Sequence, residues 1–582
     1  MGKTIANVSI LIHAEGRFKL AEQFIEETIT YFKEVIGENT IGLASLYANH
    51  ATISQAQGRY SEAEEYFDLA ESIIKKNDRI GSLSHAIVLN NKALLYNEIG
   101  QYNEALETMS LASNYAAGSL RGKGRDNVSF KINKGLIHYS AGDYGVAERT
   151  FKEIIELKKK RFAKNQTDVA NVKNYLAATL MATGKTSGVP ELIGDALNIF
   201  EKKYSRDHPA YIKTKYNKGK YNLFIGNYSE ANRLIGSVNE TYKRLYGENH
   251  PDYLSSLEDM AVTAWKEGNI SLAKSRFEKA LSANLELVEK YFGAMSEYEK
   301  GQYWAKVRPS ILKFYAFAVE YGTSDPSLLT DMYNMHLKTK GILLSASTKV
   351  RQEILNSKDE KLRSTYKDWV DAKENLLLYY SYSKAQLSEF KIDLANEEEK
   401  ANQLEKELNR LSSAFAQSNQ LPQTTLAEVK SKLKSSDAAV EIIGYPVYEK
   451  SFTSKKKYAF LIVDRNGADP ELVLIENGQD LDAKYAKAYL NMVKLKTQDR
   501  ITYDKFWRSV DEALVGKDNI YLSLDGVYFQ VNIGALQRSD GSYVSDNKSI
   551  HLYSSTRDLV KPSNSGFASK KATFFGYPDF GT

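Results

Sequence analysis

Seven glycines divide the first half of this 582-residue chain into equal parts. They recur at intervals of 42 residues: Gly16, Gly58, Gly100, Gly142, Gly184, Gly226 and Gly268. Most of them open the phrase glycine–x–aromatic–x–x–alanine, as in Gly58-Arg59-Tyr60-Ser61-Glu62-Ala63. A fixed period of this length is the signature of stacked structural repeats.

Each repeat fits a pair of helices with the glycine between them. Glycine readily adopts the left-handed conformation that ends a helix. The alanine then opens the next helix on the face where two helices approach each other closely. A small residue often follows 12 positions after the glycine, and it also permits close helix crossing; these residues are Thr28, Ala70, Ala112, Ala196 and Ala280.

These repeats resemble tetratricopeptide repeats. The long period and the phrases Asp207-His208-Pro209 and Asn249-His250-Pro251 are similar to the kinesin light chain variety. The resemblance implies an α-solenoid over residues 1–290 that binds proteins or peptides on its concave face. The two histidines are also 42 residues apart, so we interpret them as part of the turn before a helix and not as metal ligands.

The fifth unit departs from the phrase. It reads Gly184-Lys185-Thr186-Ser187-Gly188-Val189-Pro190, although Ala196 keeps the phase of the repeat. Proline is tolerated in the first turn of a helix or in a loop. We therefore expect an altered corner between the two helices of this unit.

A polar ladder stands nine residues before the glycines. It consists of Asn7, Asn49, Asn91, Asn133 and Asn217, with Tyr175 and Asp259 at the two remaining places. An amide both donates and accepts hydrogen bonds, so a row of amides can bind the backbone of an extended peptide. The alternative is that each asparagine bonds to the neighbouring repeat and fixes the stacking. Both interpretations stay open.

Residues 291–420 lose the period but keep helical spacing. The apolar run at 310–319 predicts a helix, and Pro309 suits its first position. Leu404, Leu408, Leu411 and Phe415 form an amphipathic stripe. We expect a helical linker that packs on the array or on a partner helix.

Residues 421–582 change in composition after Leu421-Pro422. β-Branched and aromatic runs bounded by turn residues predict strands at 438–445, 457–463, 472–475, 549–553 and 572–576. Helices are expected at 426–433, 480–494 and 503–515. Asp525-Gly526 between two apolar runs predicts a β-hairpin. Strands and helices in this order favour an α/β domain.

This second half resembles the front part of a CHAT domain, a caspase-like fold related to separase. The similar segments are 436–442, 521–532 with Ala535-Leu536, 552–559 and 575–580. The resemblance implies an incomplete α/β caspase-like domain after the helical linker. Proteases of this family use a histidine and then a cysteine, both downstream of the segment like 575–580.

The chain departs from that family in its reactive groups. It contains no cysteine, and His551 is the only histidine in the α/β region. A cysteine hydrolase needs a thiolate with a base beside it, so we expect no catalytic residue and no peptidase activity in these 582 residues. Ser523, Asp525 and His551 lack the Gly-x-Ser-x-Gly elbow that exposes a serine nucleophile.

Composition narrows the remaining classes of function. Acidic and basic residues are well mixed, with a net charge of +5, which argues against a nucleic-acid partner. No apolar stretch is long enough to span a membrane, and no signal peptide is recognisable. We therefore expect a cytoplasmic protein without metal or cofactor, and we make no prediction of its oligomeric state.

Two functions follow from the sequence. In the first, the array binds a protein or peptide and so regulates or targets a CHAT cysteine protease, of which these residues contain only the non-catalytic front part. In the second, the chain is a non-enzymatic scaffold with a protease-like interaction tail. We favour a fragment of a longer polypeptide over a complete protein, and reading the gene beyond residue 582 separates the two.

Overall fold

The computed structural model of the chain describes residues 8–10, 12, 18–118, 127–161, 166–292, 295–342, 354, 357–380, 382, 384–411, 421–499 and 501–560. These residues form two compact units. One comprises Met1–Phe317, Leu343–Gln420 and Glu449–Ser451. The other comprises Ala318–Ile342, Leu421–Tyr448 and Phe452–Thr582. Gly16, Asn7 and the strand expected at 572–576 lie outside the described residues.

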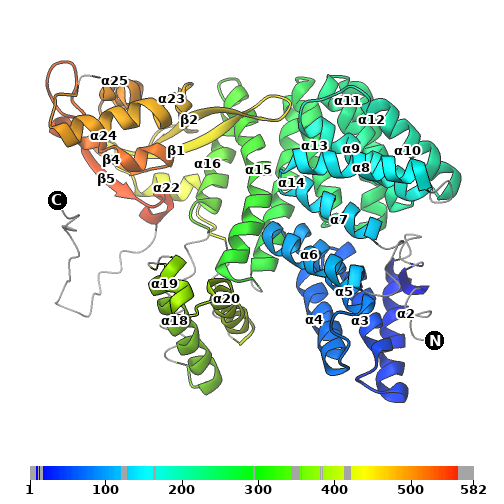
Figure 1. Ribbon diagram of the computed structural model, residues 1–582. Helices are drawn as coiled ribbons and strands as arrows, with labels where there is room; N and C mark the ends of the chain where they lie inside the picture. The colour runs from blue at the N-terminus through cyan, green and yellow to red at the C-terminus, as the bar shows by residue number, and fades with distance from the viewer. Residues whose placement is uncertain are drawn as a thin grey trace. The chain divides into compact units, whose positions relative to one another are not determined.

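The first unit begins with helix pairs that follow one another along the chain (Figure 1). The first helices of the pairs are α3 Ile41–Ala56, α5 Leu83–Glu98, α7 Asn127–Ser140, α9 Gln166–Ala182, α11 Pro209–Ile225 and α13 Pro251–Lys266. The second helices are α2 Phe18–Tyr31, α4 Tyr60–Lys76, α6 Tyr102–Gly118, α8 Tyr144–Arg161, α10 Val189–Lys203, α12 Tyr228–Tyr246 and α14 Ile270–Phe292. A short π-helix, Phe32–Ile36, continues α2.

The glycines stand at the corners between the two helices, as expected. Six of them are left-handed, with φ between +73° and +87°: Gly58 73°, Gly100 87°, Gly142 85°, Gly184 77°, Gly226 85° and Gly268 78°. The altered corner is confirmed as well, since Gly188 is also left-handed and Pro190 lies in the first turn of α10. The alanines of the phrase are fully buried.

A second contact joins the helices of each pair. The residue seven positions before each corner glycine is small, and the residue nine positions after it is large and buried. A Cβ atom on Gly135 would lie 2.7 Å from Phe151, and one on Gly219 would lie 2.6 Å from Ile235. The two helices therefore approach more closely than a larger side chain allows. The sequence interpretation missed this pairing.

The two histidines that lie one period apart, His208 and His250, each cap a helix, as the turn interpretation expected. His208 Nδ1 accepts a hydrogen bond from the Ala210 amide at 3.2 Å, and His250 Nδ1 accepts one from Asp252 at 3.1 Å. The His208 ring stacks on Tyr204 with 3.7 Å between the centroids. Burial lowers the pKa of His208, which keeps Nδ1 free to accept.

The seventh pair also contacts the second pair. His250 Nε2 donates to the carbonyl of Ala56 at 2.7 Å, and the Tyr291 hydroxyl donates to the carbonyl of Gly58. Beyond the pairs, Lys306 contacts Glu98, with Nζ 3.4 Å from Oε2. The array therefore curves until its seventh pair contacts its second pair.

The helices that the structure describes after the pairs are α15 Glu297–Tyr321, α16 Ser327–Thr339, α18 Glu360–Tyr380, α19 Lys384–Glu389 and α20 Leu394–Leu411. Pro309 does not begin a helix as expected, because it lies inside α15. The packing of the linker on the array is confirmed in α20, where Lys406 Nζ lies 2.8 Å from Glu64 of α4.

The second unit contains a five-stranded mixed sheet in the order β3-β2-β1-β4-β5. The strands are β1 Asp437–Tyr448, β2 Phe452–Asp464, β3 Glu471–Ile475, β4 Asn519–Ser523 and β5 Ser549–Tyr553. Strands β1 and β2, and β2 and β3, are antiparallel, whereas β1, β4 and β5 are parallel. Strands β1, β2, β3 and β5 occur where the sequence predicts strands, and β4 is the first of the two apolar runs around Asp525-Gly526.

Helices of this unit include α22 Leu426–Lys432, α23 Gly478–Asp480, α24 Ala486–Leu495, α25 Thr502–Phe506, α26 Arg508–Ala513 and α27 Val544–Asn547, with a π-helix at Leu481–Tyr485. One face of the sheet packs its apolar residues against the segment from Leu481 to Leu514, around the buried Trp507. The odd-numbered residues of β1 point to the opposite face.

The predicted hairpin at Asp525-Gly526 is wrong. The Asp525 carboxylate accepts hydrogen bonds from the amides of Gly526 and Gly444, both at 2.8 Å. It thereby begins a 3₁₀-helix, Gly526–Gln530, in place of a second strand. A capping carboxylate outcompetes the hairpin because it satisfies amides that would otherwise be unpaired.

Two glycines test the left-handed corner. A Cβ atom on Gly142, at the corner, or on Gly145, inside α8, meets no atom within 4 Å. Gly142→Ala should lower the free energy of unfolding by about 1–2 kcal/mol, because only backbone strain opposes it. Gly145→Ala should raise it by up to about 1 kcal/mol, since alanine favours the helix. Equal effects in chemical denaturation would contradict the assignment.

Candidate functional site

The asparagine ladder lies on the first helices of consecutive pairs. Asn49 is on α3, Asn91 on α5, Asn133 on α7 and Asn217 on α11, and Tyr175 and Asp259 occupy the same position of α9 and α13. Helical phase places one ladder position on each first helix, 42 residues apart. The ladder therefore follows one face of the array, which we call the ladder face.

Three ladder amides donate hydrogen bonds to the preceding repeat. Asn217 Nδ2 lies 2.9 Å from Asn174 Oδ1, and Asn133 Nδ2 lies 3.0 Å from Asn90 Oδ1. Asn91 Nδ2 lies 3.4 Å from Thr52 Oγ1. These are the contacts that the stacking interpretation expects. They use one donor of each amide.

The acceptors Asn90 and Asn174 stand one residue before the ladder, two periods apart. The sequence interpretation missed Asn174 as an acceptor, although its spacing of 84 residues from Asn90 follows from the sequence. At the same position of the seventh pair, Glu258 Oε1 lies 2.5 Å from Lys313 of α15. A polar contact thus continues past the last repeat.

Burial separates the ladder residues into two groups. Asn217 and its acceptor Asn174 are buried, so their amides serve the stacking contact. Asn49, Asn91 and Asn133 are half-buried and keep part of their surface in contact with solvent. The amides of Asn91 and Asn133 have more donors and acceptors than their stacking contacts use, so these two residues can also bond to a ligand.

Side chains from five first helices converge around one lysine. Lys213 of α11 lies with Nζ 5.7 Å from the centroid of the Tyr175 ring. Loss of hydration by itself lowers the pKa of Lys213. The neighbouring side chains outweigh this effect and raise the pKa; they are Tyr175, Asp252, Glu98 and Tyr139. The ammonium is therefore charged at neutral pH, and it remains exposed.

A second charged group lies further along the same helix. Lys220 Nζ lies 4.9 Å from the centroid of the Tyr216 ring, and the Tyr216 hydroxyl donates to Asp259 Oδ2 at 2.6 Å. Burial lowers the pKa of Lys220 and raises that of Asp259, although Lys313 opposes the shift in Asp259. The ladder face therefore carries tyrosines and charges of both signs beside its amides.

A separate buried cluster surrounds Glu441 in the sheet unit. Glu441 lies in the middle of β1 and is fully buried. Its Oε2 lies 2.9 Å from Lys340 Nζ and 3.4 Å from His336 Nε2. Its Oε1 accepts from the Thr556 amide at 2.6 Å and from the Ser555 hydroxyl at 3.0 Å. A carboxylate with this many donors is well satisfied inside a protein.

The cluster shifts the protonation of its members. Burial alone would raise the pKa of Glu441, but Lys340, His336 and the Thr556 amide outweigh it and hold that pKa far below its ordinary value. Burial lowers the pKa of His336, against the pull of Glu441. At neutral pH the cluster holds an ionised glutamate beside a neutral histidine.

Ser523, Asp525 and His551 are not joined into a catalytic arrangement. Ser523 is buried, and its hydroxyl donates to the Ser554 carbonyl at 3.1 Å and accepts from Lys340. The Asp525 carboxylate binds backbone amides, as described above. The His551 ring stacks on Tyr521 at 5.2 Å between centroids. Each side chain is thus engaged elsewhere.

Across the described ranges, no three His, Cys, Asp or Glu side chains are grouped so that they could hold a metal ion. Among the same residues, no helix has the length and the apolar character needed to cross a bilayer.

Comparison with known proteins identifies the repeats. Residues 44–77, which span α3 and α4, match the family described as tetratricopeptide repeat. This stretch contains the second corner glycine, and the same corner geometry recurs at the five later glycines. The array is therefore a helical solenoid of tetratricopeptide-like repeats. No curated protein matches the chain.

Solved structures with similar repeats include kinesin light chain-like proteins. A putative kinesin light chain of Podosopora anserina is 19% identical over 34% of this chain and 93% of its own, with a TM-score of 0.27. BtubC from P. vanneervenii is 21% identical over 34% and 81%, with a TM-score of 0.29. A Rap protein complexed with Competence and Sporulation Factor is 12% identical over 69% and 99%, with a TM-score of 0.41.

Identities and TM-scores this low say nothing about function. These matches also give no support for the caspase-like domain expected in residues 421–582, where the structure has a small mixed sheet flanked by helices. The caspase-like assignment therefore remains a resemblance of sequence segments.

The buried ladder amide allows a test of stacking. Asn217→Ala leaves the buried Asn174 oxygen without its donor, which should lower the free energy of unfolding by about 1–3 kcal/mol. Asn198→Ala is the matched control, because Asn198 is exposed on the second helix α10, and it should change stability by no more than about 0.5 kcal/mol. Chemical denaturation of the full chain measures both.

The Glu441 cluster predicts a dependence of stability on pH. Glu441→Gln leaves the Lys340 ammonium without its carboxylate and should lower the free energy of unfolding by about 3–5 kcal/mol at pH 7. The pKa of Glu441 is lower in the folded than in the unfolded protein. Its contribution is therefore complete above about pH 4.3, the ordinary glutamate pKa, and is lost progressively as the pH falls below that value.

Urea titrations of wild type and Glu441→Gln at several pH values check this. The difference between the two proteins should narrow below about pH 4.3. The double variant Lys340→Met with Glu441→Gln should recover part of the loss, because it removes the unpaired ammonium. A difference that stays constant with pH would contradict the assigned role of Glu441.

Proposed function

We propose that the array binds an extended protein segment on its ladder face. The observation that carries this proposal is the pair of half-buried ladder amides at Asn91 and Asn133, which have hydrogen-bonding capacity beyond their stacking contacts. An extended backbone presents a donor and an acceptor at every residue. A row of amides therefore suits it better than it suits a compact small molecule.

The charges beside the amides supply orientation. Lys213 remains charged and exposed, and Tyr175 and Tyr216 lie next to the lysines of α11. Charged groups of both signs favour a segment whose own charges are arranged in a fixed order, because placing like charges next to each other weakens binding. Asn217 takes no part in binding in this proposal, since its side chain is buried; its role is to hold the neighbouring helices in register.

The resemblance of sequence segments extends the proposal. In this extension, binding at the array regulates or targets a caspase-like CHAT cysteine protease, and residues 421–582 are the front part of its domain without the reactive histidine and cysteine. The support is the segments 436–442, 521–532 and 552–559 and their order after a repeat array. Peptide hydrolysis by the purified chain alone would contradict it, as would a gene that encodes no histidine followed by a cysteine downstream.

Peptide selection tests the binding proposal. The full chain is used to select binders from a displayed library of random linear peptides, and a selected peptide is then titrated by calorimetry. Asn91→Ala combined with Asn133→Ala should weaken its binding by about tenfold or more, because two hydrogen bonds worth roughly 1 kcal/mol each are lost. Asn198→Ala, on the second helix α10 and not on a ladder helix, should bind as wild type does.

Two results would contradict the proposal. One is a selection in which the folded chain yields no peptide that the heat-unfolded chain does not also bind. The other is unchanged affinity in the double variant with a lowered melting temperature, which would leave stacking as the sole role of the ladder.

A further inference from the structure

The five-stranded sheet of the second unit ends in two edge strands, β3 and β5. β3 pairs with β2 and β5 pairs with β4, and among the described residues no strand pairs with the outer side of either. The unpaired amide and carbonyl groups of an edge strand are a template for pairing with another chain, so proteins usually protect them with charged residues, proline or bulges. The two edges of this sheet differ in such protection.

The β3 edge is protected. The strand begins with Glu471, follows Asp469-Pro470 and is followed by Glu476. Proline has no amide hydrogen to donate to a neighbouring strand, and charged side chains stand at both ends of this five-residue strand. An edge of this kind disfavours association with the edge of another sheet.

The β5 edge lacks this protection. Ser549–Tyr553 reads Ser-Ile-His-Leu-Tyr, without proline and without an acidic residue, lysine or arginine. Its pairing with β4 continues in register through all five residues. His551 and Leu552 are exposed, and Lys548 before the strand is hydrogen-bonded to backbone carbonyls of the same unit. Uncharged β-branched and aromatic residues favour strand pairing, so this edge is suited to add a further strand.

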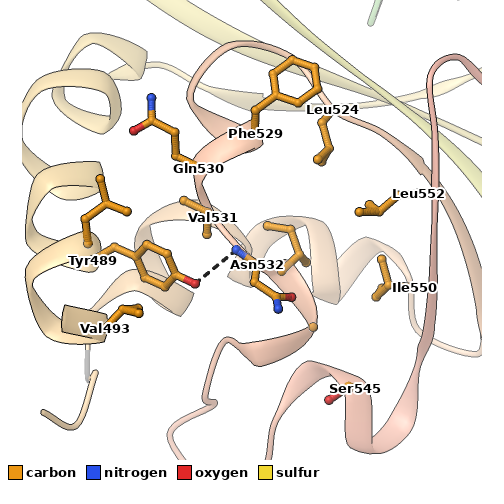
Figure 2. A pocket seen from close by; sticks show the side chains of 13 residues that line it. Tyr489, Val493, Leu524, Phe529, Gln530, Val531, Asn532, Ser545, Ile550 and Leu552 are labelled. Carbon is orange, nitrogen blue, oxygen red and sulfur yellow. Dashed lines mark hydrogen bonds between the residues drawn. The ribbon is translucent and has the colours of Figure 1, made fainter. Parts of the chain in front are cut away.

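An apolar pocket of about 600 Å³ adjoins the β5 edge on one side of the sheet (Figure 2). Its wall includes Ile550 and Leu552 of β5, Phe529 after β4 and Val493 of α24. Leu552 is 64% exposed, Phe529 70% and Val493 58%. Several exposed apolar residues around one concave site mark a surface that another group covers. None of the described residues that line the pocket is charged, so the group that covers it should be apolar as well.

We propose that β5 pairs antiparallel with β5 of a second copy of the chain, about a two-fold axis that stands perpendicular to the sheet and passes between the two His551 residues. Ile550 then lies opposite the second copy's Leu552, and Ser549 lies opposite its Tyr553. The two sheets join into one continuous sheet. This inference is independent of peptide binding at the ladder face.

The apolar side of β5 favours this arrangement. Neighbouring residues of a strand point to opposite faces, so Ile550 and Leu552 share the face on which the pocket lies, and His551 lies on the other. A two-fold axis perpendicular to the sheet keeps the pocket face common to both copies, whereas parallel pairing about an axis along the strand turns it over. Antiparallel pairing therefore places the second copy's Leu552 beside Ile550 in the pocket wall. The same contact recurs by symmetry and closes the assembly at two copies.

Sedimentation velocity of the full chain tests the proposal. The average mass of the wild type should rise toward that of two chains through the micromolar concentration range, because a small interface forms a weak dimer. Leu552→Lys should weaken association by about tenfold or more, since it places a charge against the second copy's Ile550. Leu495→Lys is the matched control, because Leu495 is 70% exposed in the same unit and does not line the pocket. This variant should associate as the wild type does, and equal melting temperatures of the two variants show that both are folded.

A cysteine at the symmetry axis tests the register. The chain has no cysteine of its own, so His551→Cys can form a disulfide only between two copies. Opposed residues of an antiparallel pair have Cα atoms about 4.5–5.5 Å apart, within the range that a disulfide bridges. Under oxidation, His551→Cys should form a cross-linked dimer at least about tenfold faster than Val515→Cys, because pairing raises the local thiol concentration. Val515 is 79% exposed in the same unit. Adding Leu552→Lys to His551→Cys should slow the cross-linking.

Three results would overturn the proposal. One is a wild type that stays monomeric, with His551→Cys cross-linking no faster than Val515→Cys, which would mean that the edge is covered within the chain or by a different partner. Another is a dimer that Leu552→Lys leaves intact, which would assign the association to another surface. The third is association that Leu552→Lys abolishes although His551→Cys fails to cross-link, which would rule out the antiparallel register.

Discussion

The array depends on how closely the two helices of each pair approach. A small residue on the first helix, such as Gly135 or Gly219, lies against a large buried residue on the second, Phe151 or Ile235. The left-handed corner glycine reverses the chain within a few residues and so fixes the phase of both helices. A larger residue at the small position would separate the helices and change the angle at which the next pair stacks. The curvature of the whole array therefore rests on these contacts.

Curvature, repeated from pair to pair, brings distant residues together. His250 reaches the carbonyl of Ala56, and Glu98 and Asp252 come near enough to Lys213 to raise its pKa. No single repeat contains this group of charges. It exists because the pairs stack in a curved array, and a change in the angle between two neighbouring pairs would move every residue further along the stack. The ladder face is thus a property of the stack and not of any one helix.

The periodic features of the fold could be predicted from the sequence, and the contacts across periods could not. Corner glycines, buried alanines and capping histidines each repeat with the period, so their local roles follow from spacing alone. The hydrogen bond from Tyr291 to Gly58 joins residues 233 positions apart, and the spacing of residues in the sequence does not predict it. Asn174 belongs partly to each group. Its position two periods after Asn90 follows from the sequence, but its role as an acceptor follows only from the contact with Asn217 on a neighbouring helix. At Asp525-Gly526 the sequence predicts a hairpin, but the Asp525 carboxylate binds backbone amides and begins a 3₁₀-helix there.

Glu441 explains why the helix α16 belongs with the sheet. A carboxylate in the middle of a buried strand is costly unless donors surround it. Its donors come from Lys340 and His336, at and just beyond the end of α16, and from Ser555 and Thr556 after β5. The strand β1 can therefore be buried at low cost only when both segments are in place. This ties residues 318–342 to the sheet unit, although their helical spacing alone assigns them to the linker. The contacts of the buried Glu441 carboxylate, and not the composition of residues 318–342, place these residues in the sheet unit.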